Sequence, residues 1–461
     1  MLLVRLFLLF VFGLDVLFNF SSYLSCHNFL YALRRSKQSN IFSLGIGSKK
    51  TIDDLGDIYG KVVLVRVDFN VPIKDGLVLD TYRLERAKET IENLTKRGAK
   101  VVLMFHLGRP KGKIVQEYRI EPVIAKFSEM LGKEIKIGPD AVVGDELREL
   151  VSKMNPGEVI SLQNLRFHSG EEKQDEAFAE AILNYTRAEI YVNDGSANMH
   201  GSDQVSETIL PLLMQRRGLP TVLGKLVVEE FGILENFVKG GIDLALFGGS
   251  KFEKIESIKN LVSSGRVKTV FLSGAMAHLF LKAKGFELGK SKIDTELVSE
   301  AEEILALAEK RGVRIVLPVD VRLDDGSLLV IADKKGNKIA DIPPERAIWD
   351  IGIITLKMLK DMMEMIPSSG RIISNGTAGW LEKGFPFDWG TNDINRMLIN
   401  HPAEKLILGG EGAFAALNML AEYQGTPEQF NMTILTAGGA ALAYLAERAD
   451  ELTPFNYIDT K

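Results

Sequence analysis

The feature of this sequence that most constrains its fold is an alternation of short apolar runs with longer amphipathic segments. Short apolar runs bounded by turn residues are typical of buried strands, and strands that alternate with helices form parallel sheets covered by helices on both faces. In the first half, strands are predicted at 61–67, 101–105, 159–162 and 188–192, and helices at 81–97, 120–131 and 174–186.

The same alternation restarts after a helical stretch at 219–238. Further strands are predicted at 244–247, 269–272, 314–317, 371–374, 405–408 and 433–435. The 461 residues suffice for two or three domains. We therefore predict an α/β protein with two doubly wound, Rossmann-like parallel-sheet domains, at 51–220 and 221–445, joined by a helix. Ligands of such sheets bind beyond the carboxyl ends of the strands.

Residues 1–50 differ in character from the rest of the chain. They are rich in Leu and Phe and hold six basic residues and one acid, so the remainder carries a net charge of −10. The uncharged run at 6–14 resembles a signal-peptide core, but no small-residue cleavage site follows it. Three interpretations stay open: a dispensable or artefactual leader, a membrane or targeting segment that keeps the remainder in the cytoplasm, and a folded part of the core.

Composition excludes several classes of function. The single cysteine, Cys26, rules out a disulfide framework and a cysteine-cluster metal site. The acidic remainder argues against a nucleic-acid surface. If the ligand is an anion, the basic groups that bind it must therefore be gathered locally.

In the first half, polar side chains follow the predicted strands. They are Asp68 and Asn70 with Arg83 after the first strand, His106 and Arg109 after the second, Arg166 after the third, and Asn193, Asp194 and His200 after the fourth. Arginine pairs bidentately with phosphate or carboxylate oxygens. Three arginines from separate strand ends and a histidine predict a small anion pocket.

In the second half, glycines follow the strands instead. The turns are Gly248–Lys251, Ser273–Ala275, Asn375–Gly379, Gly409–Gly412 and Gly438–Gly439. Glycine lets backbone N–H groups approach a phosphate at a helix N-terminus, where the helix dipole also favours an anion. Neither GxxxxGK[ST] nor GxGxxG is present. The turns predict a phosphate cradle for a nucleotide, and Lys251 supplies a cation suited to a transferring phosphoryl group.

Taken together, these segments resemble phosphoglycerate kinase. The resemblance covers residues 52–445 and rests on RVDFNVP (66–72), HLGRPKG (106–112), NLRFHSGEEK (164–173), GGSK (248–251), LPVDV (317–321) and DIG (350–352), in the order of that family. It implies phosphoryl transfer between 1,3-bisphosphoglycerate with ADP and 3-phosphoglycerate with ATP, supported by Mg²⁺. It also implies a cytoplasmic monomer with two lobes and a closing hinge, whose residues 446–461 pack back on the first lobe.

The resemblance implies a role for each matching residue. Contacts to 3-phosphoglycerate fall on Asp68, Asn70, Arg83, His106, Arg109 and Arg166. The transferring phosphoryl group is expected to face Arg83, Lys251, Gly438 and Gly439, and Mg²⁺ is expected at Glu411. The nucleotide is expected at Gly248, Gly249, Lys251, Gly274, Leu317, Asn375, Gly379, Glu382, Gly409 and Gly410, with Glu382 on the ribose.

The sequence also departs from the family pattern. His200 is followed by Gly201 where the family has arginine, so one phosphate-binding arginine is missing or is replaced by Arg187, Arg216 or Arg217. Lys254 lies three residues after Lys251 rather than four, which predicts that it points elsewhere. The family's NGPMG becomes NGTAG at 375–379, and its GGGDT becomes GGEGA at 409–413.

These departures leave three hypotheses. The first is an active, divergent kinase similar to archaeal forms. The second is a non-catalytic paralogue that binds phosphorylated ligands, and the third is a kinase of another small phosphorylated acid. Three histidines are predicted to be structural or surface groups: His168, His278 and His401. The three tryptophans, Trp349, Trp380 and Trp389, are predicted to be packing residues, although Trp380 could border the nucleoside.

Overall fold

The computed structural model describes residues 45–200, 204–448 and 451–461. Most of the predicted leader and Gly201 lie outside the described residues. Within the described part of the chain, no helix is long and apolar enough to cross a membrane.

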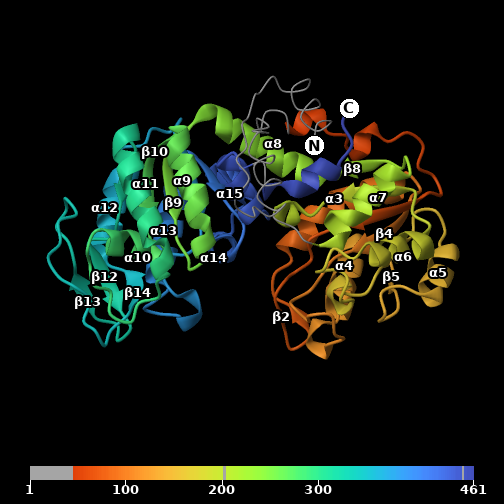
Figure 1. The fold of residues 1–461 in the computed structure, drawn as a ribbon, viewed down its shortest axis with the longest axis horizontal. Coiled ribbons are helices and arrows are strands. Elements are labelled where there is room, and N and C mark those ends of the chain that lie inside the picture. The colour runs from red at the N-terminus through yellow and green to blue at the C-terminus, as the bar shows by residue number, and fades with distance from the viewer. Residues whose placement is uncertain (1–44, 201–203, 449–450) are drawn as a thin grey trace, which may run out of the picture. The chain divides into compact units, whose positions relative to one another are not determined.

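The first half forms a six-stranded parallel sheet (Figure 1). Its order is β5 (Ile135–Ile137), β6 (Val159–Ser161), β4 (Lys100–Met104), β1 (Val62–Arg66), β7 (Ile190–Asn193) and β8 (Thr221–Leu223). One face packs on α3 (Tyr82–Lys96) and α4 (Glu121–Leu131), and the other on α5 (Asp145–Ser152), α6 (Glu176–Thr186) and α7 (Ile209–Arg216). Val63 and Val65 of β1 face α3, whereas Leu64 faces α6, as the two-residue period of a strand requires.

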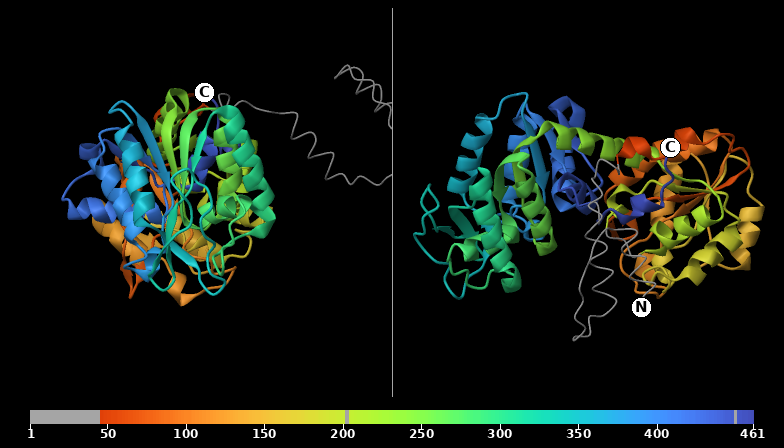
Figure 2. Two further views of the ribbon diagram at one scale, coloured as in Figure 1. Left: turned by 90° about the vertical axis from the view of Figure 1, so that its left-hand side faces the viewer. Right: turned by 45° about the horizontal axis from the view of Figure 1, so that its top comes forward.

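The second half repeats this plan with another six-stranded parallel sheet (Figure 2). Its order is β11 (Arg314–Val316), β10 (Val267–Leu272), β9 (Ile242–Phe247), β15 (Arg371–Asn375), β16 (Glu404–Ile407) and β17 (Met432–Ile434). The helices α9 (Ile255–Ser264), α10 (Gly274–Ala283) and α11 (Val298–Arg311) cover one face, and α12 (Ile353–Glu364), α13 (Trp389–Asn400) and α14 (Glu411–Glu422) cover the other. The predicted pair of doubly wound parallel sheets is confirmed.

Several parts of the fold differ from the sequence prediction, and strand β5 of the first sheet was not predicted. The stretch 219–238 is not helical throughout, because β8 occupies Thr221–Leu223 and α8 (Lys225–Gly240) begins only after Gly224. A short buried run has the same apolar signal in a strand as in a helix. A third sheet, which is antiparallel and was not predicted, contains β13 (Leu328–Val330), β12 (Asp320–Leu323) and β14 (Ile348–Ile351), and a small hairpin pairs β2 (Ile73–Lys74) with β3 (Leu77–Val78).

Helix α8 is hydrogen-bonded to strand ends of both sheets. At its start, Leu226 N donates to the Asp194 carboxylate after β7, at 3.0 Å. Further along, the Glu230 carboxylate accepts from Thr436 N at 2.6 Å and from Ala437 N at 3.1 Å, in the turn after β17. Burial raises the pKa of Asp194 to about 8 and also raises the pKa of Glu230. These two carboxyl groups fix α8 to the turns at which the site residues lie.

The last residues of the chain pair with its first described residues and with β8. Lys49 and Thr460 form an antiparallel bridge, and Lys461 N donates to Ser48 O at 2.9 Å. Asp459 N donates to Thr221 O at 3.0 Å. Figure 1 shows the C-terminal end beside β8. The folded body therefore includes residues 45–50, which the sequence analysis assigned to the leader.

Candidate functional site

Six predicted residues gather beyond the carboxyl ends of β1, β4 and β6, and we call them the basic half-site: Asp68, Asn70, Arg83, His106, Arg109 and Arg166. Arg83, in the first turn of α3, pairs with the Asp68 carboxylate. The Asn70 Oδ1 atom accepts from Gly108 N at 3.0 Å, and Arg166 Nη1 donates to Gly108 O at 3.0 Å. Residues from three strand ends are thus joined through one glycine of the HLGRP turn.

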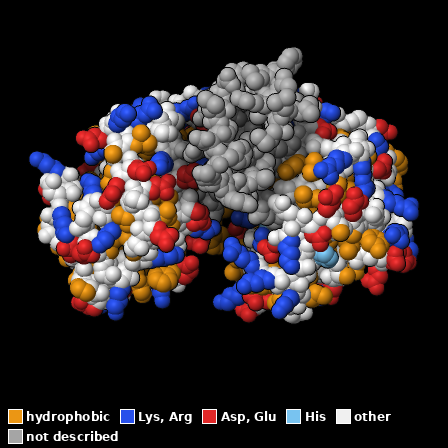
Figure 3. All heavy atoms as spheres, viewed as in Figure 1, with side chains coloured by type: hydrophobic (Ala, Val, Ile, Leu, Met, Phe, Trp, Pro, Cys, Tyr) orange, Lys and Arg blue, Asp and Glu red, His pale blue; other side chains and the backbone are white. Residues whose placement is uncertain are grey.

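Lysine and arginine side chains gather near this half-site. Figure 3 shows them around the hairpin of β2 and β3. Arg109 itself is exposed, and its charge acts on His106. A local basic surface on an acidic chain is what the sequence predicted for an anionic ligand.

His106 is held as a neutral imidazole. Arg66 Nη2 lies 3.0 Å from His106 Nδ1. Because arginine can only donate, Nδ1 accepts and the ring proton is on Nε2. Burial lowers the pKa of His106 well below its usual value, and the charges of Arg66 and Arg166 lower it further. His106 can therefore offer a ligand a hydrogen-bond donor without carrying a charge itself.

Arg66 belongs to the RVDFNVP segment but was not predicted as a site residue. It is fully buried and lies 2.9 Å from the equally buried Glu207 carboxylate. Its Nε donates to Ser206 Oγ at 3.0 Å, and Ser206 Oγ donates to Glu171 at 2.6 Å. Burial raises the pKa of Glu171. Arg66 positions His106 from behind and does not reach a ligand itself.

None of the three arginines considered as substitutes for the missing one lies in the basic half-site. Arg187 ends α6 just before β7, and Arg216 and Arg217 end α7 just before β8. Residues that precede a strand lie at the amino edge of a parallel sheet, opposite the site. Arg216 and Arg217 instead pair with acids of α6 on the surface.

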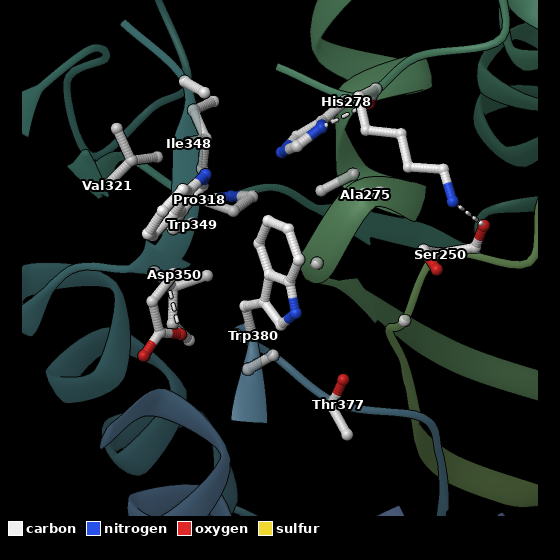
Figure 4. Close-up of a pocket in the computed structure, with 18 of the residues that line it drawn as sticks. Ser250, Ala275, His278, Pro318, Val321, Ile348, Trp349, Asp350, Thr377 and Trp380 are labelled. Carbon is white, nitrogen blue, oxygen red and sulfur yellow. Dashed lines mark hydrogen bonds between the residues drawn. The ribbon is translucent and has the colours of Figure 1, made fainter. Parts of the chain in front are cut away.

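The second half holds a cavity of about 400 Å³ beyond the carboxyl ends of β9, β10 and β15 (Figure 4). We call it the glycine-rich cavity. Of the predicted residues, it is lined by Gly249, Gly274, Gly379, Glu382 and Glu411. The others lie at neighbouring strand ends without lining it: Gly248, Lys251, Leu317, Asn375, Gly409, Gly410, Gly438 and Gly439.

The glycines are needed because the turns pack against one another. A Cβ on Gly248 would lie 2.2 Å from Thr377 O, and one on Gly409 would lie 2.1 Å from Thr436 O. The N–H groups of Gly248, Gly249, Gly274 and Gly409 donate to carbonyls of adjacent turns. The expectation that these turns offer N–H groups to a phosphate is therefore wrong for these four residues, which shape the cavity wall instead.

Lys254 lies with Lys251 rather than pointing elsewhere, contrary to the sequence prediction. Burial lowers the pKa of Lys254 to about 8, and the charge of Lys251 lowers it further, while the charge of Glu411 acts in the opposite direction. Lys292, which was not among the predicted site residues, lines the cavity with its Nζ 3.4 Å from Ser250 O. Three lysines (Lys251, Lys254 and Lys292) and two acids (Glu253 and Glu411) thus surround the turn after β9.

Several other lining residues were predicted to be structural. Trp349 and Trp380 line the cavity and meet edge to face with ring centroids 5.1 Å apart. Trp380 is 46% exposed, so the prediction that it could border a ligand fits its position. His278, which was predicted to be a structural or surface residue, also lines the cavity. It lies four residues after Gly274 on α10, a spacing that places both on one helix face and was visible in the sequence.

His200 follows β7 and lies against the N-terminus of α15 (Gly439–Leu445). A Cβ on Gly439 would be 3.0 Å from the His200 ring. Asp350, next to Trp349 on the cavity wall, accepts from Gly390 N at 2.7 Å, and burial raises its pKa to about 7. The Asp350 carboxyl group thus holds the cavity wall through a backbone N–H group.

Comparison with known proteins agrees with this geometry. Residues 52–448 match the family model described as phosphoglycerate kinase. Similar curated proteins include the phosphoglycerate kinases of Roseiflexus sp. (strain RS-1), 36% identical over 87% of this chain and 97% of the relative, and of Finegoldia magna, 36% identical over 86% and 96%.

Solved structures give the same result. Phosphoglycerate kinase from Pyrococcus horikoshii OT3 superimposes with a TM-score of 0.72 at 26% identity, covering 88% of this chain and 98% of the other. The enzyme from Coxiella burnetii superimposes with a TM-score of 0.67 at 26% identity, covering 89% and 98%. Sequence, fold and site thus lead to one conclusion: this chain belongs to the phosphoglycerate kinase family.

Proposed function

We propose that this chain transfers a phosphoryl group reversibly between 1,3-bisphosphoglycerate with ADP and 3-phosphoglycerate with ATP. The reaction serves glycolysis and, in reverse, gluconeogenesis. The observation that carries the proposal is the basic half-site, in which Arg83 and Arg166 are held in one hydrogen-bonded unit beside a neutral His106. An anionic triose acid fits such a set of donors.

The chemistry requires little from the protein beyond positioning and charge. The acceptor is a carboxylate that is already ionised at neutral pH, so no general base is needed. Arg166 and Arg109 would hold the phosphate and carboxylate of the triose, and His106 would donate through Nε2. Arg83, fixed by Asp68 and oriented by Asn70 O at 3.4 Å, would face the group in transfer.

The glycine-rich cavity is the proposed nucleotide site. Trp349 and Trp380 supply flat apolar surface for the nucleoside, and Glu382 would bind the ribose hydroxyls. Lys251, with Lys254 beside it, would follow the negative charge as it moves between donor and acceptor. The N-termini of α14 and α15 would add partial positive charge at the same edge.

Magnesium is implied by the family, and the residues present fit it. Mg²⁺ with nucleotides is usually held by one or two carboxylates together with phosphates. Among the described residues there is no group of three or more candidate metal ligands, so a dedicated protein cage is absent from that part of the chain. Glu411, the single carboxylate at the start of α14 that lines the cavity, matches this donor set. The ion would neutralise phosphate charge during transfer.

The proposal includes three further expectations. Transfer requires the basic half-site and the nucleotide to come together about a hinge. The active species is a monomer, and its place in the cell is the cytoplasm. Sedimentation at increasing protein concentration would contradict the monomer if the mass doubled.

A coupled assay of the full chain with Mg²⁺, ATP and 3-phosphoglycerate tests the proposal. We expect turnover that falls at least about 100-fold in Lys251→Ala, equivalent to about 2.7 kcal/mol of barrier. Lys310→Ala, at the exposed end of α11, serves as the control and is expected to keep full activity.

Two results would contradict the proposal. A folded chain that binds Mg-ADP without turnover would be a non-catalytic paralogue. Turnover with another phosphorylated acid, but none with 3-phosphoglycerate, would identify a different substrate. A panel of phosphorylated acids of similar size separates these two outcomes.

A further inference from the structure

His278 carries a polar atom for which the structure provides no partner. Its side chain is 3% exposed, and Nε2 has no hydrogen-bond partner among the described residues. Figure 4 shows this second ring nitrogen pointing into the space bordered by Ala275, Pro318 and Ile348. Buried polar atoms nearly always have a partner, so an unpartnered atom on a cavity wall points to a ligand that supplies one.

The protonation of the other ring nitrogen determines which hydrogen-bonding group that ligand must supply. Nδ1 lies 2.7 Å from the carbonyl oxygen of Lys292. A carbonyl can only accept, so Nδ1 carries the proton and Nε2 is left with a lone pair. Burial lowers the pKa of His278 to about 4, which keeps the ring neutral near pH 7. The cavity therefore contains a hydrogen-bond acceptor locked in one tautomer.

The position of His278 indicates which part of a nucleotide it would contact. The cavity has a polar end at Ser250 and Glu411 and an apolar wall that includes Leu281, Val321 and Trp349. Phosphates belong at the polar end and a purine at the apolar wall. His278 lies one turn of α10 beyond the Gly274 turn, about 6 Å along the helix axis, on the face that it shares with Leu281.

We propose that His278 determines base specificity: its Nε2 accepts a hydrogen bond from the exocyclic amino group of a 6-aminopurine. A 6-oxopurine would place a second acceptor against the same lone pair and would be disfavoured. This inference rests on the proposed function, because it assumes that the cavity is the nucleotide site. His278 is a specificity-determining residue and touches no reacting atom.

The experiment measures dissociation constants of the full chain for ADP, IDP and purine riboside diphosphate, which has hydrogen at position six. Trp349 and Trp380 line the cavity, so their fluorescence reports binding without turnover. We expect the wild type to bind ADP about tenfold or more tightly than either analogue, the usual effect of one buried hydrogen bond.

Two substitutions sharpen the test. In His278→Phe the acceptor is gone, so ADP should bind about tenfold more weakly and the three ligands should become equivalent. In His278→Gln the amide can present either oxygen or NH₂, so IDP binding should improve while ADP binding is retained. The control is His168→Phe, a histidine stacked on Phe178 in the first half of the chain, which should keep the wild-type preference.

The outcomes separate this inference from the proposed function. A preference for ADP that is unchanged in both His278 variants, in protein that unfolds at the wild-type temperature, overturns the inference alone. Equal affinity of the wild type for ADP and IDP does the same. Failure of the wild type to bind ADP or to turn over overturns both. If His278→Phe does not fold, the purine riboside diphosphate comparison in the wild type and the His278→Gln variant decide the question.

Discussion

The basic half-site and the glycine-rich cavity lie at equivalent edges of two similar sheets, but different parts of the chain form them. In the basic half-site, charged side chains reach across strand ends and hold one another, as Arg83 does with Asp68. In the cavity, backbone turns pack so closely that a Cβ at Gly248 would meet Thr377 O at 2.2 Å. The first is an arrangement of side chains, and the second is an arrangement of backbone.

The difference teaches how each part can fail. A side-chain site depends on buried charges that must remain paired, so its weak point is the buried ion pair behind it. A backbone site depends on the absence of side chains, so its weak point is any added atom. The following predictions test this distinction, from the largest expected effect to the smallest.

Removing the buried cation behind the basic half-site should have the largest effect. In Arg66→Met the fully buried Glu207 loses the guanidinium 2.9 Å away, and the free energy of unfolding should fall by about 3 to 5 kcal/mol. Urea denaturation measures it. Arg217→Met, which breaks a surface pair with Glu180, should change stability by about 1 kcal/mol or less. Equal losses in the two variants would contradict the distinction.

Adding one methyl group to the cavity wall should have the next largest effect. In Gly248→Ala the Cβ would meet Thr377 O and Ser273 Oγ, so the turns must separate. The free energy of unfolding should therefore fall by about 2 to 3 kcal/mol. In Gly232→Ala in α8, the Cβ would meet no side chain or other segment within 4 Å, so the substitution should be neutral or stabilising by up to about 1 kcal/mol. Calorimetry of both variants makes the comparison, and a wild-type melting temperature for Gly248→Ala would refute it.

The pH dependence of stability tests whether His278 is held neutral in the folded chain. The pKa of His278 is about 4 in the folded chain and about 6.5 when unfolded, so the unfolded state binds more protons between these values. Its contribution to stability is full above about pH 6.5 and is lost as the pH falls toward 4. Between about pH 7.5 and pH 5, wild type should lose about 2 kcal/mol that His278→Phe does not lose.

Only the difference between the two proteins is informative here. Burial raises the pKa of Asp350 to about 7, which acts with the opposite sign, and His106, whose pKa is lowered by burial and by Arg66, is present in both proteins. Parallel stability curves for wild type and His278→Phe would show that His278 is not held neutral by the fold.

The smallest effect is expected for Glu411, the carboxylate proposed to hold Mg²⁺. Glu411→Gln should raise the Mg²⁺ concentration for half-maximal activity about tenfold, the loss typical when one supporting group of a metal is removed. Glu422→Gln, at the other end of α14, is the matched control. Activity titrated with Mg²⁺ measures both, and identical titrations would remove Glu411 from the proposed metal site.

The sequence predicted the two sheets and most of the strand-end residues because their signals are local. Apolar runs and the arginines after them can be read from a few neighbouring residues. The antiparallel sheet of β12, β13 and β14 was missed because polar residues interrupt its short apolar runs, as Asp320 and Arg322 do in β12 and Asp350 does in β14. The Arg66–Glu207 pair joins residues far apart in the chain, and the turn-to-turn packing at Gly248 exists only once three strands are side by side. Such long-range contacts leave no local pattern.

Because Asp459 pairs with Thr221, the first half of the chain cannot complete this edge of its sheet until the last residues have been synthesised. The two residues are 238 positions apart. At about 5 to 20 residues per second, the ribosome needs about 10 to 50 seconds between making one and making the other. Throughout that interval the outer edge of β8 near Thr221 lacks its final partner, and an unpaired strand edge can pair with another chain. The last residues of the chain therefore complete a domain that began to emerge long before them.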